Sequence, residues 1–163
     1  MFPDPMVWDS NYTALLAASD GRVYVGLNRH GAGASVAVYD PRTDTMRLLG
    51  DMNRLAGETN LNAEPQAKVH TQICEGPDGR IYFGTHLSAF FGFATFSKPD
   101  GYPGGHWMVY DPRTDAVTDL GIALPSNGLI TMTIDPKRER LYALTYPQAH
   151  FLIYDIRTGK TTD

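Results

Sequence analysis

The chain has 163 residues, of which 42% are hydrophobic and 20% are charged, and its formal net charge at pH 7 is −4. This composition is typical of a folded globular domain and excludes extended disorder. The small negative charge gives no general attraction to nucleic acid or to an anionic membrane, so we expect neither as a partner. Cys74 is the only cysteine, which excludes an intrachain disulfide.

The N-terminal segment gives no indication of export. Residues 1–5 read MFPDP, without a basic region or an apolar run. No later window has the length and apolar character of a membrane span. The sequence therefore contains no recognisable signal peptide or transmembrane segment and leaves the compartment undetermined.

One short motif recurs three times along the chain. Residues 20–26 read DGRVYVG, residues 78–84 read DGRIYFG, and residues 138–144 read RERLYAL as a looser third copy. The aligned arginines lie 58 and 60 residues apart and are Arg22, Arg80 and Arg140. Asp-Gly between two apolar runs is a strong signal for a tight hairpin, because glycine tolerates the positive φ that such a turn requires. The motif therefore predicts a hairpin in each repeat.

A second motif follows each copy of the first. It reads VYDPRTD at residues 38–44 and again at 109–115, and IYDIRTG at 153–159. Proline presets φ for a turn, and the aspartate carboxylate can accept a hydrogen bond from a backbone amide further along. A two-motif unit that occurs three times indicates an internal structural repeat.

Each repeat is interpreted as four short antiparallel strands. In the second repeat we expect strands at 70–75, 80–85, 107–110 and about 116–120, because these runs are rich in β-branched and aromatic residues and are separated by turn signals. Helical periodicity is absent. The sequence therefore predicts an all-β domain over 1–163, with four-stranded units at about 11–50, 68–121 and 128–163.

The repeats resemble those of β-propellers. The Tyr-Asp-Pro-x-Thr turns are similar to those of kelch and related bacterial propellers, and the Asp-Gly-Arg-x-Tyr hairpins to those of lactonase-type propellers. The resemblance implies three blades of a propeller. Three blades do not close a ring, since propellers usually have four to eight. We therefore expect either a fragment that lacks further blades or self-association into a larger ring.

Two long loops are expected at the same end of the predicted blades. They span 51–67, between the first and second repeats, and 87–105, inside the second repeat, where four phenylalanines lie among glycines. Long loops in a compact repeat commonly carry function. An aromatic loop of this kind can stack on sugar rings, contact a partner subunit, or pack locally against its own blade.

Three histidines are expected near this end of the second repeat. His70 begins its first strand, His86 follows its second, and His106 precedes its third. Imidazoles ligate metals and carry protons near neutral pH. One hypothesis is that the three histidines bind a divalent metal; the alternative is that they only bond to nearby backbone.

A second hypothesis is acid and base chemistry without a metal. Tyr146 aligns with His86 at the end of the second strand of its repeat, Asn28 takes the same position in the first repeat, and Arg29 is adjacent. Histidine, tyrosine and arginine together suit β-elimination from a uronic acid, and some propeller polysaccharide lyases use such groups. In this hypothesis His86, His106, Tyr146 and Arg29 are the catalytic candidates.

Three functions remain open from the sequence. The chain could be a carbohydrate-active enzyme, a non-catalytic propeller that binds a glycan or a protein, or a scaffold whose functional site lies in missing blades. Paired carboxylates of the kind that glycosidases use are not evident near the loops, because Asp40, Asp111 and Asp155 are already explained by turns. Lyase or metal chemistry is therefore preferred over hydrolysis within the enzyme class.

Overall fold

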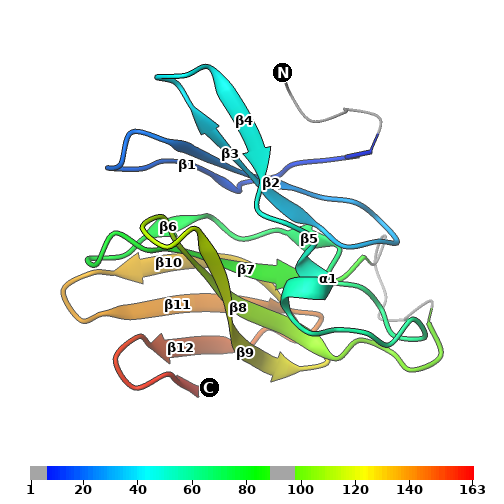
Figure 1. Ribbon diagram of the computed structural model, residues 1–163. Coiled ribbons are helices and arrows are strands. Elements are labelled where there is room, and N and C mark those ends of the chain that lie inside the picture. The colour runs from blue at the N-terminus through cyan, green and yellow to red at the C-terminus, as the bar shows by residue number, and fades with distance from the viewer. Residues whose placement is uncertain (1–6, 89–97) are drawn as a thin grey trace.

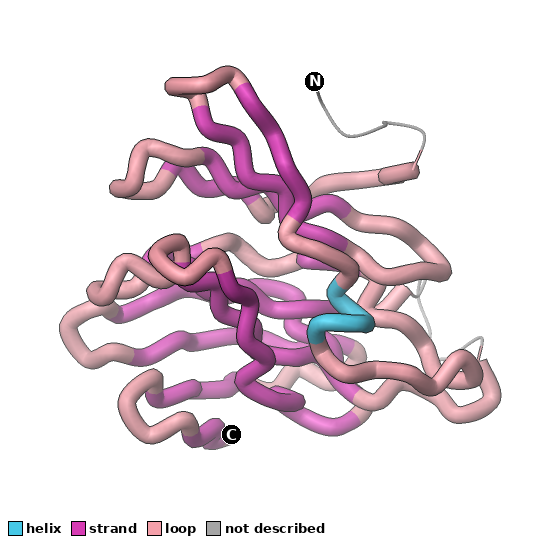
Figure 2. Tube along the Cα trace, viewed as in Figure 1, coloured by secondary structure: helices cyan, strands magenta, loops and turns pink. Residues whose placement is uncertain are grey.

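The computed structural model describes residues 7–88 and 98–163, and it shows an all-β protein with three antiparallel sheets (Figures 1 and 2). The aromatic residues Phe90, Phe91, Phe93 and Phe96 of the second long loop lie outside the described residues. Each sheet is built from consecutive strands of one repeat, so the sheets follow one another in chain order. The sequence prediction of three antiparallel β-units is confirmed.

The first and third sheets have four strands each. The first contains β1 (Leu15–Ala17), β2 (Val23–Leu27), β3 (Ser35–Asp40) and β4 (Thr45–Leu48). The third contains β10 (Gly128–Asp135), β11 (Arg140–Tyr146), β12 (Phe151–Asp155) and β13 (Lys160–Thr162). In both sheets every neighbouring pair is antiparallel, and the strands are paired in chain order.

The second sheet lies between the other two and has an interrupted edge. It contains β5 (Lys68–Val69), β6 (Cys74–Glu75), β7 (Ile81–His86), β8 (Gly104–Asp111) and β9 (Ala116–Pro125). β5 pairs with the end of β7 and β6 with its beginning, so together they replace the single strand expected at 70–75. Between them the hydroxyl of Thr71 accepts a hydrogen bond from the backbone N–H of Gly84. A side chain here substitutes for a backbone acceptor, which explains the break.

The loop between the first and second sheets contains a single helical turn, α1 (Met52–Leu55). Asp51 caps its N-terminus by accepting a hydrogen bond from the backbone N–H of Arg54 at 3.1 Å. A four-residue helix is too short to produce a periodic pattern, so the sequence did not reveal it. Figure 1 places α1 at the opposite end of the sheets from the β10–β11 and β12–β13 turns, as expected if long loops gather at one end.

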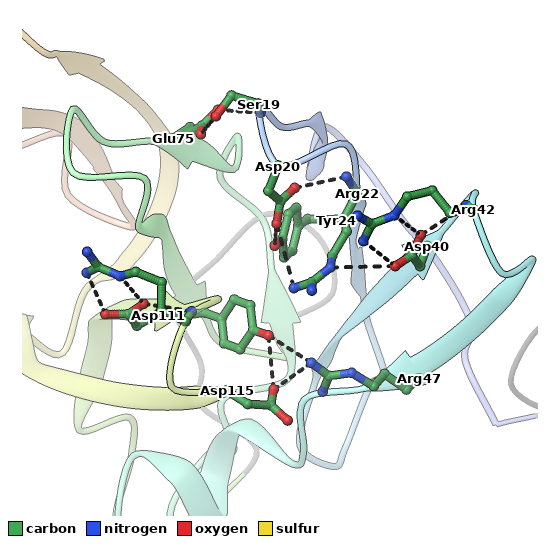
Figure 3. Close-up of polar contacts among 12 residues, drawn as sticks. Ser19, Asp20, Arg22, Tyr24, Asp40, Arg42, Arg47, Glu75, Asp111 and Asp115 are labelled. Carbon is green, nitrogen blue, oxygen red and sulfur yellow. Dashed lines mark hydrogen bonds and ion pairs between the residues drawn. The ribbon is translucent and has the colours of Figure 1, made fainter.

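The three aligned arginines occupy equivalent places. Each lies at the start of the second strand of its sheet and approaches the aspartate that ends the third strand. The Nε to Oδ2 distances are 3.9 Å for Arg22 to Asp40, 3.2 Å for Arg80 to Asp111 and 3.7 Å for Arg140 to Asp155. Figure 3 shows the first of these pairs beside the turn of the second motif. The two sequence motifs are therefore linked by one repeated ion pair.

Two apolar cores fill the spaces between successive sheets. The core between the first and second sheets includes Tyr24, Val36, Phe83 and Tyr110, and the core between the second and third sheets includes Trp107, Met132, Leu141, Leu152 and Tyr154. We call the face of each sheet that looks toward the next sheet in chain order its forward face, and the opposite one its back face. Inside the stack, each forward face packs against the following back face.

Glycine on the forward face allows the close approach of sheets. A Cβ atom at Gly26 would lie 3.0 Å from Cβ of Val69, and one at Gly84 would lie 2.6 Å from Cδ1 of Leu129. Both neighbours belong to the following sheet. Spacing of sheets in the stack therefore depends on the absence of a side chain at these two equivalent positions.

Candidate functional site

Four rings form a continuous row across the three sheets at the end where the long loops lie. Tyr12 stacks on His70 with ring centroids 4.5 Å apart, His70 meets His86 edge to face at 5.3 Å, and His86 meets Tyr146 edge to face at 5.8 Å. We call these four residues the ring row. Tyr12 precedes β1, His70 follows β5, His86 ends β7 and Tyr146 ends β11, so all three sheets contribute.

His86 is the most buried member of the ring row. Its side chain packs over Gly128, and its Nδ1 is a buried atom without a hydrogen-bond partner. Burial, together with the smaller effects of His70 and Lys68, lowers the pKa of His86 to about 3. The imidazole is therefore neutral at physiological pH. A neutral imidazole keeps one nitrogen with a lone pair, which can accept a hydrogen bond.

His70 is also held in its neutral form. Burial lowers its pKa, against the opposing effect of a hydrogen bond between Nδ1 and the carbonyl oxygen of Ile130 at 2.9 Å. Because a carbonyl oxygen only accepts, Nδ1 of His70 carries the proton and Nε2 has the lone pair. The geometry thus supplies a second neutral imidazole, oriented by the backbone of the third sheet.

Lys68 adds a buried cation beside the two imidazoles. It pairs in register with His86 across β5 and β7, is 5% exposed, and its Nζ lies 5.8 Å from the ring centroid of Tyr12. Burial lowers its pKa, and Asp9 offsets part of that effect. An anion that approaches a buried ammonium stabilises its charged form and raises its depressed pKa.

Asn28 contributes a second buried polar atom without a partner. Its Oδ1 accepts a hydrogen bond from the backbone N–H of Val69 at 2.9 Å, whereas its Nδ2 has none. This side chain occupies the position in the first sheet that His86 occupies in the second. The structure therefore brings an unpaired amide donor and an unpaired imidazole nitrogen to equivalent strand ends.

Of the catalytic candidates from the sequence, the structure brings together His86 and Tyr146. Arg29 follows Asn28 in an exposed position, where its backbone N–H donates to the carbonyl oxygen of Ala67 at 2.9 Å. Its guanidinium has no ion pair with a described residue. Arg29 thus lies next to the site in sequence but is not part of the ring row.

His106 belongs to a different cluster. Its Nδ1 lies 2.9 Å from Oδ1 of Asp119, and its Nε2 lies 3.0 Å from Oε1 of Glu58. Burial opposes charge on this ring, but the hydrogen bonds and charges of the two carboxylates outweigh burial and raise its pKa. An imidazolium that donates from both nitrogens has no lone pair for a metal or a substrate proton. The expected catalytic or ligating role of His106 does not fit this geometry.

The expected metal trio does not assemble. Among residues 7–88 and 98–163, no group of three or more histidine, cysteine, aspartate or glutamate side chains is placed to hold a metal ion. His70 and His86 are neighbours, and His106 is engaged by Asp119 and Glu58. His86 and His106 lie on the neighbouring strands β7 and β8, whose side chains alternate between the two faces, so adjacent strand ends do not imply that the side chains converge.

Two members of the site were missed by sequence reasoning. Tyr12 precedes the first strand, and Lys68 begins the second repeat; a lone tyrosine and a lone lysine carry no motif. Lys68 pairs with His86 across β5 and β7, but the strands predicted at 70–75 and 80–85 included neither residue.

Comparisons with known proteins give structural likeness without a family. No family model matches the chain, and no curated protein matches it. Solved structures do match. The extracellular domain of a protein from B. thetaiotaomicron, described as a candidate one-component system, gives a TM-score of 0.56 at 16% identity and covers 91% of this chain.

Two further structural matches are enzymes. An ulvan lyase from a new family of polysaccharide lyases, also solved bound to -[GlcA(1-4)Rha3S]-, gives a TM-score of 0.53 at 15% identity over 96% of this chain. Dipeptidyl peptidase 4 of Porphyromonas gingivalis gives 0.50 at 10% identity over 91%. The chain spans 16%, 39% and 24% of the three neighbours' lengths respectively. At these identities the likeness shows the fold alone.

The chain thus belongs to the class of all-β proteins built from stacked antiparallel sheets. Within the described residues, no helix is long and apolar enough to cross a membrane.

Proposed function

We propose that the chain forms part of a β-propeller that binds an acidic carbohydrate at the ring row and cleaves it by β-elimination. The observation that carries the proposal is the neutral, buried imidazole of His86, which has an unpaired Nδ1 and lies between His70 and Tyr146. The three stacked sheets, each formed by one copy of the repeat, support the propeller architecture, in which equivalent strand ends surround a common axis.

β-Elimination from a uronate needs three groups. A base removes the proton from C5, the electron pair of that bond forms the double bond between C4 and C5, and the C4–O bond breaks as its oxygen takes a proton. A cation near the carboxylate stabilises the charge that develops. In our assignment a neutral imidazole, His86 or His70, is the base, the phenol of Tyr146 is the acid, and Lys68 faces the carboxylate. Arg29, exposed beside Asn28, is the second cation that we assign to substrate binding.

The anionic character of the substrate follows from the cation of the site. Lys68 is buried without an ion pair among the described residues, so an incoming carboxylate or sulfate would restore the interactions that its ammonium lost on burial. Among structural neighbours, the ulvan lyase has been solved with a polymer unit that contains glucuronate and a sulfated rhamnose. Ulvan is therefore the first substrate to test.

The test is an assay for the unsaturated product. The protein is incubated with ulvan, with polyglucuronate and with neutral dextran, and ultraviolet absorbance of the new double bond is followed. We expect product from at least one uronate polymer and none from dextran. His86→Ala should abolish the product while leaving the circular dichroism spectrum unchanged. His150→Ala is the matched control, because that imidazole pairs with Asp163 outside the ring row and its loss should leave activity intact.

Two other results would redirect the proposal. Retention of a uronate polymer without product would favour the non-catalytic propeller that binds a glycan. Loss of activity on chelation, restored by a divalent metal, would favour metal-assisted chemistry over the metal-free assignment. If no uronate polymer is retained and none gives product, a carbohydrate function at this site is overturned. That result would favour the scaffold, whose functional site lies in further blades.

A further inference from the structure

The forward face of the third sheet exposes apolar side chains whose counterparts are buried inside the stack. Leu144 is 44% exposed and Phe151 is 54% exposed, whereas Trp107, which takes the place of Phe151 in the second sheet, is 1% exposed. The ring of Phe151 stacks on Tyr142 with centroids 5.9 Å apart. A pocket of about 390 Å³ opens on this face. Exposed apolar surface of this kind marks an interaction site.

The back face of the first sheet is exposed in the same way. Register places Leu15 opposite Val25 in the first sheet and Met132 opposite Ala143 in the third, and Ile73 takes the same place in the second. Ile73 and Met132 are each 3% exposed because the preceding sheet covers them, whereas Leu15 is 63% exposed. The two ends of the stack therefore present the same two kinds of face that join inside it.

The two end faces also differ from the internal ones in complementary ways. Leu144 stands where the first and second sheets have glycine, so it fills space that a following sheet occupies elsewhere. In the internal junctions, the residue that meets the glycine is Val69 or Leu129. Asn11 holds that position in the first sheet, and its amide donates to the carbonyl oxygen of Gly26 at 2.6 Å. A larger residue on one face thus matches a smaller one on the other.

Charges at the two ends are complementary as well. Inside the stack, Arg47 of β4 donates to the hydroxyl of Tyr110 at 2.8 Å and to Asp115 of the second sheet (Figure 3). The matching pair on the first sheet is Tyr39 and Asp44, whose hydroxyl to carboxylate distance is 3.0 Å. Among the described residues, no arginine or lysine side chain donates to the Tyr39 and Asp44 pair as Arg47 does to Tyr110 and Asp115.

The third sheet carries a cation that suits this pair. Pairing places Thr162 of β13 where β4 has Arg47, and Lys160 lies two residues earlier on the same strand. Residues two apart in a strand share a face, so Lys160 lies on the same face of β13 as the counterpart of Arg47. Its side chain is exposed.

We propose that copies of this chain associate head to tail, with the forward face of the third sheet packed on the back face of the first sheet of a second copy. The junction repeats the two internal ones, with Leu144 against Asn11 and Lys160 near Asp44. It also places Tyr146 of one copy beside Asn28 of the next, because these residues occupy the same strand end as His86. The second copy thereby extends the ring row. This association does not depend on the proposed lyase activity.

The experiment is a complementation test by sedimentation velocity. Leu144→Glu places a charge in the forward face, Leu15→Glu places one in the back face, and Leu61→Glu is the control in an exposed loop position away from both faces. Wild type and the control should form species larger than a monomer. Each face variant alone should sediment as a monomer, because every junction would contain one altered face. A mixture of the two should form a 1:1 dimer through the one junction with both faces intact.

Each outcome decides the matter. A mixture that dimerises while its components do not supports the head-to-tail contact, whether wild type forms rings or longer assemblies. Association of Leu15→Glu alone, without gain on mixing, would overturn it in favour of two identical faces in contact. A folded wild type that is monomeric at high concentration would overturn it as well and would indicate that a sheet from another chain or chain segment covers these faces. Circular dichroism of every variant identifies misfolding, and then Leu144→Lys and Leu15→Lys replace the failed variant.

Discussion

A Cβ atom at Gly128 would lie 1.9 Å from Nδ1 of His86. The imidazole occupies the space directly over the glycine, and the three nearest atoms to that missing Cβ all belong to the His86 ring. The third sheet therefore positions the ring of His86, which belongs to the second.

This relationship predicts strong coupling between the two positions. Gly128→Ala should destabilise the protein by about 1–3 kcal/mol, the usual cost of overpacking, and should displace the imidazole. In a His86→Ala background the ring is absent, so the same substitution should cost much less. A double-mutant cycle from urea unfolding measures this difference. Equal costs of Gly128→Ala in both backgrounds would contradict the contact.

The cluster of His106 with Glu58 and Asp119 predicts a loss of stability at alkaline pH. Because the folded state raises the pKa of His106, its contribution is fully present below the unfolded pKa of about 6.5 and disappears as pH rises through the higher folded pKa. His70 and His86 act oppositely: their lowered pKa values make stability fall as pH drops below about 6.5.

The measurement is the free energy of unfolding as a function of pH for wild type and His106→Gln. Above pH 6.5, wild type should lose stability more steeply than the variant, because the variant has no proton to lose at that site. Glu58→Gln and Asp119→Asn should each reduce the difference, since each removes one of the carboxylates that stabilise the charge. Identical alkaline slopes for wild type and His106→Gln would exclude the ionised cluster.

Close contact between the second and third sheets predicts that Gly84 does not tolerate a side chain. Gly84→Ala should cost about 1–3 kcal/mol, because the new Cβ would meet Leu129 in a filled core. Leu144→Ala, at the equivalent position in the third sheet, should cost less than Gly84→Ala because Leu144 is already largely exposed. Thermal unfolding of both variants below the association concentration makes the comparison.

Cys74 should be chemically inert in the folded protein. The thiol lies in the core between the second and third sheets, and burial raises its pKa to about 11. Because the thiolate is the reactive form, modification by a thiol reagent at neutral pH should require unfolding. The rate of labelling should therefore rise with urea in step with the unfolding transition. Fast labelling without urea would show that the two sheets separate locally.

The acidic limb of the proposed lyase activity should lie well below the usual range of histidine. With the pKa of His86 at about 3, the base keeps its lone pair far into acid, so activity should not fall as pH drops through 6.5 unless the protein unfolds. Kinetics on a uronate polymer, with circular dichroism at each pH, separates the two causes. A fall centred near 6.5 in folded protein would indicate that another imidazole is the base.

The fold was predictable from sequence because short local motifs determine its turns. The Asp-Gly and Tyr-Asp-Pro turns place two hairpins in each repeat, and the Arg80 to Asp111 pair links those motifs. The strand boundaries that the sequence did not predict depend on contacts between residues distant in sequence. β9 extends to Pro125 because Pro125 pairs with Gly104, which lies at the end of the long loop. No local sequence pattern predicts this pairing.

The site was predictable only where repeat alignment applied. Equivalent positions correctly brought His86 and Tyr146 together. The hydrogen bonding of His106 depends on Glu58, which is 48 residues away in sequence and lies in a loop without a regular sequence pattern. The environment of Lys68 likewise comes from Tyr12 in the first sheet. Side-chain direction and burial, rather than residue type, decided both cases.

Three different functional groups occupy one backbone position in this chain. Asn28 follows β2, His86 ends β7 and Tyr146 ends β11. Their backbones still pair, with Ser10, Lys68 and Gly128 respectively. An amide, an imidazole and a phenol thus occupy equivalent positions, and the contacts of each are specific to its sheet. Exchanging these side chains, as in Asn28→His, would therefore change how neighbouring sheets pack, because Asn28 accepts a hydrogen bond from the backbone N–H of Val69 and His86 packs over Gly128.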